Sequence, residues 1–365
     1  MKQQCTIIAE AGVNHNGDLN AALELVDRAA EAGADFVKFQ TFRPAELASH
    51  VAPKAAYQTR TTDATESQLD MLRRLELTED AHQHLIERCA KKKIGFLSTP
   101  FDLASLHFLT RELNLQLIKL GSGDLTNAPL LLAAGRSGAR IILSTGMGTL
   151  SEVEQALGVI AYGILAEDKP STAAFRSVLN LPEAWKALQT TVTLLHCTTE
   201  YPAAVEDTNL SAMTTMRQAY GLPVGYSDHT EGNAISFAAV AMGASVIEKH
   251  FTLDRKMSGP DHAASLEPAE LVDLVQGIRD VEVAIGTGIK RPGRAELANR
   301  IVARKSLIAS RDLPAGTILS EGDIRTKRPG GGLSAMSYWE AIGKPLAEDV
   351  TEGSYIRIAC QMDPE

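Results

Sequence analysis

The sequence predicts an α/β fold, a (β/α)₈ TIM barrel, followed by a small, mainly β C-terminal domain. Three observations lead to this prediction. Eight short apolar runs recur between residues 5 and 251, most gaps between them show helical periodicity, and the composition changes after residue 288. Short buried strands that alternate with helices pair in parallel, and eight such units are the number that closes a barrel.

The predicted strands lie, in chain order, in the segments CTIIAEAG, DFVKFQTF, GFLSTPF, LQLIKLGS, RIILSTGM, TVTLLHCT, PVGYSDHT and SVIEKHF. Between them, LNAALELVDRAAEAG, TEDAHQHLIERCAKKK and EVEQALGVIAYGILAE have the apolar spacing of helices. An open, doubly wound sheet is the structural alternative. It predicts a GxGxxG turn after the first strand, where the sequence has EAGVNHNGD. The barrel is therefore favoured, although the strand pattern alone also fits a sheet.

The C-terminal part has a different character. The segment IKRPGRAELANRIVARKSL is basic and resembles a linker, and the following residues combine short strands with turn signals and a Pro-Gly cluster. We expect a barrel at 1–285, a linker at 286–302 and a small domain at 303–365. A domain of that size is marginal alone, so it is expected to dock on another surface.

Composition excludes several classes of protein. The 365 residues include 36 Lys and Arg against 45 Asp and Glu, a net charge of −9, which argues against a nucleic-acid partner. The N-terminus has no signal-peptide pattern, and no apolar stretch is long enough to span a membrane. The four cysteines are scattered without a C-x-x-C pair, which is typical of a reduced, cytoplasmic protein.

The predicted strands end in polar residues, which packing does not require. In a barrel these C-terminal ends share one mouth, where catalysis takes place. A single Ser or Thr there is more often a solvated loop residue, but eight successive polar ends indicate a common polar cavity. The residues concerned are Glu10, Lys38, Gln40, Ser98, Thr99, Lys119, Ser122, Asp124, Ser144, Thr145, His196, Ser227, Asp228, His229, Glu248 and His250.

Lys38 is the clearest of these residues. Strand alternation places Lys38 and Gln40 on one face and Phe39 on the other. A buried lysine must be paired with an anion or lose its charge, and a structural ion pair with Glu10 is the alternative to a functional role. Together with Lys119, nearby hydroxyls and the glycine amides of KLGSGD and STGMGT, Lys38 fits a seat for a phosphate and a carboxylate.

His229 and His250 follow two successive predicted strands, so both can reach one ion, with Glu10 or water completing the shell. Imidazole with carboxylate and water suits Mn, Fe or Zn. The alternative is a pair of satisfied core histidines. No local H-x-x-H motif is present, so spacing leaves both interpretations open.

Over essentially its whole length the chain resembles the sialic acid synthase family, which makes nonulosonic acids from phosphoenolpyruvate (PEP) and an N-acylated hexose. The motifs that carry the resemblance include IIAEAGVNHNGD, GADFVKFQTF, FLSTPFD, LLHCTTEYP, GYSDHT, IEKHFTLD, MSGPDHAASLEP and TKRPGGG. The C-terminal part is similar to the antifreeze-like (SAF) domain that these synthases append to their barrel.

The resemblance implies roles for individual residues. His229 and His250 would bind a divalent metal, Mn²⁺ with Mg²⁺ or Co²⁺ as alternatives, and Glu10 would lie near the metal-bound water. Arg328 would reach from the small domain into the barrel of the other subunit of a domain-swapped homodimer. The PEP-binding residues would be Lys38, Thr99, Lys119, Ser122, Ser144, Thr199 and Ser227. The acceptor-sugar contacts would be Gln40, Asp124, Tyr201 and Asp261.

Two departures concern the substrates. The chain has Asp124 where the family often has Glu, and Thr199 where some members have Asn. The first N-terminal motif and HCTTEYPA favour the N,N'-diacetyllegionaminate-forming branch over N-acetylneuraminate synthases. Three other activities are alternatives: a Schiff-base aldolase using Lys38 or Lys119, a synthase for a phosphorylated sugar, and a non-catalytic carbohydrate- or ice-binding protein.

Overall fold

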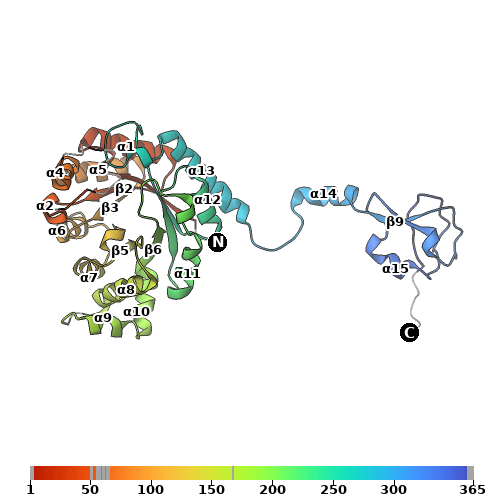
Figure 1. Cartoon of the computed structure of the whole chain (residues 1–365). Helices are drawn as coiled ribbons and strands as arrows, with labels where there is room; N and C mark the ends of the chain where they lie inside the picture. Colours follow the sequence, from red (N-terminus) through yellow and green to blue (C-terminus); the bar gives the residue numbers. More distant parts are fainter. Residues whose placement is uncertain are drawn as a thin grey trace. The chain divides into compact units, whose positions relative to one another are not determined.

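The computed structural model describes residues 4–49, 52–54, 59, 62, 66–166 and 168–359 (Figure 1). The chain divides into two compact units, Met1–Gly286 and Thr287–Glu365. Within the described part, Cys5, Cys89 and Cys197 are buried free thiols, whereas Cys360 lies outside it. None of the described helices is both long and apolar enough to cross a lipid bilayer.

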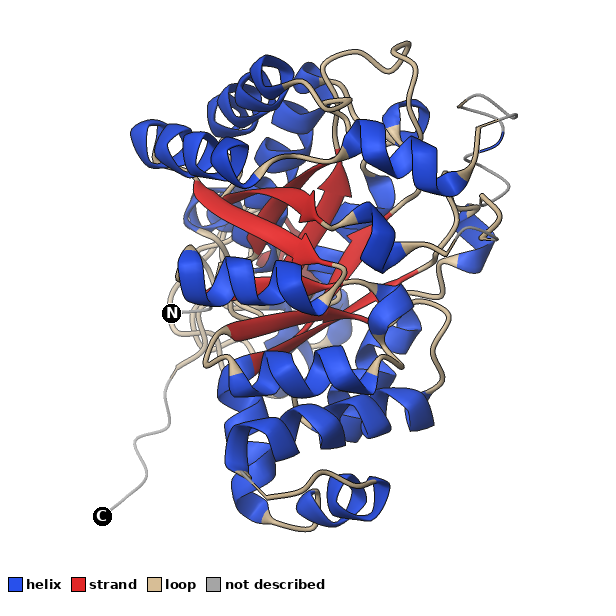
Figure 2. Ribbon diagram, turned by 90° about the vertical axis from the view of Figure 1, so that its left-hand side faces the viewer, coloured by secondary structure: helices blue, strands red, loops and turns tan. Residues whose placement is uncertain are grey.

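The first unit is the predicted barrel (Figure 2). Its strands are β1 Thr6–Gly12, β2 Phe36–Thr41, β3 Gly95–Pro100, β4 Leu117–Leu120, β5 Arg140–Ser144, β6 Val192–Cys197, β7 Val224–Asp228 and β8 Val246–His250. The sheet order is β3-β2-β1-β8-β7-β6-β5-β4, and the ladders are parallel. Because β1 pairs with β8 as well as β2, and β3 contacts β4, the sheet closes on itself. The open-sheet alternative is therefore wrong.

Helices surround the strands. They are α1 Leu19–Ala32, α2 Pro44–Leu47, α4 Gln68–Leu75, α5 Glu79–Lys92, α6 Leu103–His107, α7 Ala128–Arg136, α8 Leu150–Leu165, α9 Thr172–Val178, α10 Pro182–Thr191, α11 Ser211–Tyr220, α12 Ala234–Ala241 and α13 Pro268–Ile285. The three segments with the clearest helical spacing form α1, α5 and α8, which confirms those predictions. Local signals fix their ends: the Asp18 carboxylate caps α1, and Gly33 ends it with a φ of 82°.

The barrel interior changes character along its axis. Ile8, Leu97, Ile142, Leu195 and Val246 form a buried apolar cluster. Each of these residues lies two or four positions before a polar side chain on the same face of its strand. Because side chains alternate between the two faces of a strand, those polar side chains also point into the barrel, closer to its C-terminal end. The larger core packs the outer strand faces against the helices. Consequently the C-terminal end of the barrel is the polar end.

The second unit has its own small core. Helix α14 (Arg294–Ala303) precedes β9 (Ser306–Ala309), which pairs antiparallel with β10 (Ile324–Lys327), and α15 spans Tyr338–Ala341. The buried residues are Leu307, Ala309, Leu313, Leu319, Ile324, Ala341, Leu346, Val350 and Ile356. Isolated antiparallel bridges supply most of the remaining β structure.

Candidate active site

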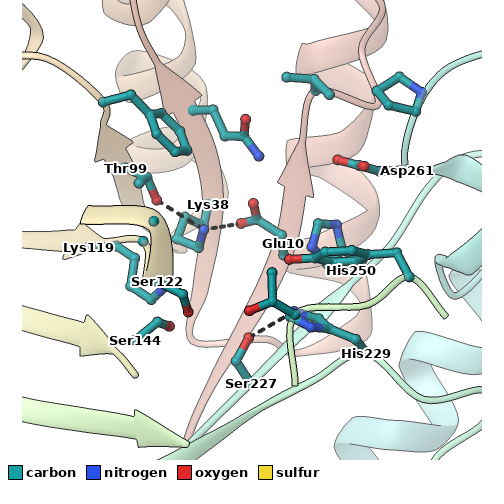
Figure 3. A pocket seen from close by; sticks show the side chains of 18 of the residues that line it. Glu10, Lys38, Thr99, Lys119, Ser122, Ser144, Ser227, His229, His250 and Asp261 are labelled. Carbon is teal, nitrogen blue, oxygen red and sulfur yellow. Dashed lines mark hydrogen bonds and ion pairs between the residues drawn. The ribbon is translucent and has the colours of Figure 1, made fainter. Parts of the chain in front are cut away.

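A pocket of about 410 Å³ lies at the C-terminal ends of the barrel strands (Figure 3). Thirteen of the fifteen residues to which the family resemblance assigns roles line it, and they come from all eight strands or the loops that follow them. These residues are Glu10, Lys38, Gln40, Thr99, Lys119, Ser122, Ser144, Thr199, Tyr201, Ser227, His229, His250 and Asp261.

The other two of these residues, Asp124 and Arg328, are not part of the pocket lining. Asp124 ends the 3₁₀ turn η2 (Ser122–Asp124), does not line the pocket, and accepts a hydrogen bond of 2.9 Å from Asn127 Nδ2. Burial raises the pKa of Asp124. Arg328 is an exposed residue of the second unit.

Not every polar strand end faces the pocket. Ser98, Thr145, His196 and Asp228 are one residue out of phase with the lining residues, and each bonds to a group outside the pocket lining. His196, for example, donates from Nε2 to the carbonyl of Thr208 at 2.7 Å. A polar residue at a strand end is therefore a site residue only if it lies on the strand face that points into the barrel.

Four buried charges meet at the centre of the pocket. Lys38 Nζ lies 2.6 Å from Glu10 Oε2 and 3.7 Å from Glu248 Oε2, and it donates to Thr99 Oγ1 at 3.1 Å. Lys119 Nζ lies 3.4 Å from Glu248 Oε1, which also accepts the Ser227 hydroxyl at 2.9 Å. The Glu10–Lys38 pair that the sequence left open is thus formed, inside the pocket.

These contacts give the carboxylates of Glu10 and Glu248 different pKa values. Burial raises the pKa of Glu10 to about 7, against the opposing effect of Lys38. Burial also disfavours ionised Glu248, but Lys119 and Lys38 outweigh it and lower the pKa of Glu248 to about 2. Two carboxylates whose pKa values are pushed apart can take different roles, one permanently charged and one exchanging a proton near neutral pH.

Hydroxyls and a close backbone segment surround the two lysines. Gly146 N–H donates to Ser122 Oγ at 3.0 Å. A Cβ atom at Gly146 would lie 2.3 Å from Thr199 Oγ1 and 2.8 Å from Ser122 Oγ, so only glycine lets the backbone approach these hydroxyls. Ammonium groups and hydroxyls are the donors that phosphate and carboxylate ligands need, and the Gly146 amide orients one of these hydroxyls.

The two histidines lie side by side on the opposite wall, with ring centroids 5.6 Å apart (Figure 3). His229 Nδ1 donates to the Thr198 carbonyl at 2.6 Å, which makes Nε2 an acceptor whose neighbour is Ser227 Oγ at 3.3 Å. Burial lowers the pKa of both rings, to about 4 for His229, so both are neutral at pH 7. The Tyr201 ring packs 4.2 Å from the His229 ring.

The residues fit a divalent ion held by two protein ligands. His250 Nδ1 is buried without a hydrogen-bond partner, and neutral imidazole is the form that binds metal. Within the described ranges, no three His, Cys, Asp or Glu side chains are clustered as a complete metal shell. The remaining ligand positions would therefore belong to water or substrate.

One side of the pocket is apolar. Helices α2 and α4 and the loops after β1 and β3 contribute Val13, Leu47, Met71, Leu72, Leu75 and Phe101. These side chains belong to a hydrophobic cluster separate from the main core. A ligand that fills the pocket thus meets charges on one side and hydrocarbon on the other.

Sequence reasoning missed part of this site. Glu248 was considered only as a polar strand end, although the alternation that places His250 in the pocket also places Glu248 there. Cys197 also lines the pocket, and its thiol lies 3.1 Å from Ser122 Oγ. The apolar wall gave no recognisable signal, because α2 and α4 lie in a long connection whose path alternation does not predict.

Known proteins match this chain over most of its length. The NeuB family model covers residues 25–290 and the SAF domain model covers residues 304–360. The chain is 50% identical to the N,N'-diacetyllegionaminic acid synthase of Campylobacter jejuni over 96% of this chain and 98% of that protein. The protein of the same name from Legionella pneumophila is 42% identical over 96% and 92%.

A solved structure agrees with these matches. The N-acetylneuraminic acid (sialic acid) synthetase of Leptospira borgpetersenii, solved with citrate, superposes with a TM-score of 0.63 and 35% identity, covering 81% of this chain and 90% of that one. The residues that carried the sequence resemblance, the closed barrel and these matches agree. The chain belongs to the NeuB family of sialic acid synthase homologues and carries a SAF domain after its barrel.

Proposed function

We propose that this protein condenses PEP with 2,4-diacetamido-2,4,6-trideoxymannose to give N,N'-diacetyllegionaminate and phosphate. The observation that carries the proposal is the division of one pocket into a doubly cationic, hydroxyl-rich side and a pair of neutral histidines. The names of the two relatives that are 50% and 42% identical support this product. N-acetylmannosamine, giving N-acetylneuraminate, is the alternative acceptor.

Lys38 and Lys119 would hold PEP by its phosphate and carboxylate, with hydroxyls from Thr99, Ser122 and Ser144 completing the contacts. The two ammonium groups are already fixed by Glu10 and Glu248, so little reorganisation accompanies binding. Their contribution is positioning and electrostatic stabilisation of the reacting anion.

His229 and His250 would hold the divalent ion, Mn²⁺ in our proposal, and with it the open-chain aldehyde of the sugar. When bound, such an ion supplies Lewis-acid polarisation of the aldehyde oxygen. Tyr201 packs against both histidine rings and Asp261 lines the same pocket, so both are placed to contact the acceptor. Burial raises the pKa of Asp261 to about 6, which suits a hydrogen bond to a sugar hydroxyl.

The chemistry would form one C–C bond between the substrates and one C–O bond to water, and it would break the C–O bond to phosphate. C3 of PEP attacks the aldehyde carbon, whose oxygen takes a proton, and cationic character develops at C2. Water adds at C2 while Glu10 accepts its proton, and the resulting hemiketal phosphate loses phosphate to give the 2-keto acid. The pKa of about 7 places Glu10 where it can both accept and return a proton.

The apolar wall supports the trideoxy acceptor over N-acetylmannosamine. That sugar carries a C6 methyl group and two acetamido methyl groups, which Leu47, Met71 and Leu75 can pack against. A C6 hydroxyl facing the same wall would lose hydrogen bonds to water without replacement. The two substrates therefore differ at the groups that this wall would contact.

We further propose a homodimer in which Arg328 of one chain serves the barrel of the other. The match to the SAF domain supports this arrangement, as do Leu297, Ile301 and Val302 of α14, which their own unit leaves exposed. Mixing Lys38→Ala and Arg328→Ala chains tests it, since each mixed dimer has one intact site. Recovery of about a quarter of wild-type activity is expected from random pairing, and no recovery would contradict the exchange.

A reducing compartment, the cytoplasm, is also part of the proposal. It is supported by the free, buried thiols of Cys5, Cys89 and Cys197. Quantification of free thiols in protein purified under an inert atmosphere, without added reductant, is expected to find all of them reduced.

The deciding experiment measures phosphate release from PEP with Mn²⁺, comparing the two acceptors with and without EDTA. Metal-dependent release that is faster with the trideoxy sugar supports the full proposal. Faster release with N-acetylmannosamine would change the product to N-acetylneuraminate, and no release with either sugar would contradict the function. Activity that survives EDTA would contradict the metal role of the two histidines.

A further inference from the structure

A buried ion pair lies directly behind the two histidines, on the outer face of the barrel wall. Lys249 Nζ is 2.9 Å from Asp228 Oδ2, and the side chains are 1% and 0% exposed. Asp228 ends β7 and Lys249 is its partner in the β7–β8 ladder. Neither residue lines the pocket, so this pair is not part of the site described above.

The pair is joined to Thr230, the residue that follows His229. The N–H and hydroxyl of Thr230 both donate to Asp228 Oδ1, at 2.9 and 2.8 Å. Lys249 donates to the Thr230 carbonyl at 2.7 Å, and Ser236 donates its hydroxyl to Asp228 Oδ2 at 2.6 Å. Thr230 is thus fixed at three atoms by two charged side chains.

This network connects the backbones that carry the two imidazoles. Thr230 follows His229 and Lys249 precedes His250, so the network fixes one chain to the other within one residue of each ring. On its other side, His229 is oriented by the Thr198 carbonyl. Contacts outside the pocket lining thus fix the backbone on both sides of His229 and next to His250.

Stability alone does not explain such a pair. Burying two charges carries a desolvation penalty that their attraction often only offsets, and apolar replacements of such pairs are frequently neutral or stabilising. A rigid relation between two strand ends, by contrast, requires directional bonds. We propose that Asp228 and Lys249 are positioning residues that hold His229 and His250 at the separation needed to bind one divalent ion. This inference rests on the proposed metal role of the histidines.

The test uses the full chain and the double variant Asp228→Asn/Lys249→Met, which removes both charges with little change in shape. Mn²⁺ affinity is measured without substrates from the electron paramagnetic resonance signal of free Mn²⁺, and PEP affinity is measured calorimetrically in EDTA. We expect Mn²⁺ affinity to fall about tenfold or more, as for other groups that orient metal ligands. PEP affinity should stay within about twofold, because Lys38 and Lys119 are untouched.

Thr41→Val is the matched control. Thr41 belongs to a comparable buried network behind β2 and β3, where its hydroxyl lies 2.8 Å from His82 Nε2 and 2.7 Å from Ser98 Oγ. This variant should lose folding stability without losing Mn²⁺ affinity. A general loosening of the barrel would instead weaken Mn²⁺ binding in both variants, which would overturn the inference.

Other outcomes are equally decisive. A folded double variant with wild-type Mn²⁺ affinity, or with equal losses for Mn²⁺ and PEP, would overturn the positioning role while leaving the proposed function intact. If wild type binds no Mn²⁺, or His229→Ala binds it unchanged, the metal role fails and the inference fails with it. If the double variant does not fold, Thr230→Val replaces it, with the same selective loss expected and a wild-type affinity again contradicting the role.

Discussion

The carboxylate of Glu10 contacts the ammonium of Lys38 at 2.6 Å in a pocket where both side chains are buried. The pair is held between two parallel strands in register, Glu10 opposite Lys38. Because burial raises the pKa of Glu10 to about 7 even beside this cation, the carboxylate can exchange a proton at the pH at which the enzyme is expected to work. The ion pair with Lys38 thus involves the same carboxylate that we propose as the catalytic base.

Glu10→Gln is expected to remove the pH dependence near neutrality. In wild type, kcat/KM for PEP should fall about tenfold per pH unit below pH 7, as the base becomes protonated in the free enzyme, and level off above it. The variant should be slower by about 10²- to 10⁴-fold and have no such limb. Phosphate release from pH 5.5 to 8.5 measures both quantities. Glu231→Gln, at an exposed position after β7, is the control. A Glu10→Gln profile that keeps the fall in kcat/KM below pH 7 would assign the base elsewhere.

The two lysines should act as charges and not as Schiff-base nucleophiles. Burial disfavours charged Lys38, but Glu10 and Glu248 outweigh it and raise the Lys38 pKa. Burial lowers the pKa of Lys119, but Glu248 and Glu10 oppose this shift, and the Lys119 ammonium pairs with Glu248 at 3.4 Å. Lys38→Met and Lys119→Met should therefore each raise the KM for PEP about 10- to 100-fold, the value of a hydrogen bond to a charged group. Lys256→Met, on an exposed loop, should not.

Borohydride separates the two mechanisms. Protein treated with substrates and borohydride should keep its mass and its activity, because no imine forms. A stable adduct found on either lysine by mass spectrometry would establish the aldolase instead.

The strand phase explains how much of the site could be predicted. Lys38 and Gln40 were placed on one face by alternation, and both line the pocket. The same rule, applied to Asp228 and His229, separates the outer residue from the inner one. From the sequence, Asp228 is grouped with His229 because both are polar residues at the end of one strand. A residue of a buried ion pair on the outer face gives the same sequence signal as a site residue.

Other features depend on contacts that no local pattern contains. Glu248 becomes central only when Lys38 and Lys119, from β2 and β4, converge on it. The apolar wall depends on how the long connection between β2 and β3 packs on the barrel mouth. The resemblance of the motifs identified the family without Glu248 or the apolar wall. It depends on which residues the sequence contains and not on how their charges are arranged in the folded site.

Leu47 is predicted to contribute to acceptor preference. It lies at the end of α2 and is half-buried in the apolar wall. Leu47→Gln should lower kcat/KM for the trideoxy sugar about tenfold and change it less for N-acetylmannosamine, because the difference in one apolar contact is worth that much. Steady-state kinetics with both sugars gives the ratio. Glu46→Gln on the same helix is the control, and an unchanged ratio in Leu47→Gln would exclude this wall from recognition.

Asp261 should make the barrel less stable as the pH rises from 4 to 7. Its pKa in the folded state, raised by burial to about 6 from 3.8, means that the folded protein binds the proton more tightly than the unfolded chain. The stabilisation is therefore complete below pH 4 and is lost through pH 6, a change of about 3 kcal/mol in the free energy of unfolding. Asp261→Asn cannot ionise and should escape this loss.

The chain has two tryptophans, Trp185 in the barrel unit and Trp339 in the second unit. Removing Trp339 therefore lets fluorescence report the unfolding of the barrel alone. Urea titrations in a Trp339→Phe background, monitored by Trp185, should show the stability of Asp261→Asn rising relative to wild type between pH 4 and 7. Asp273→Asn, on an exposed position of α13, controls for the loss of a carboxylate as such. A constant difference between Asp261→Asn and wild type across this range would mean that Asp261 is ionised throughout, and its hydrogen bond to the sugar would then be accepted and not donated.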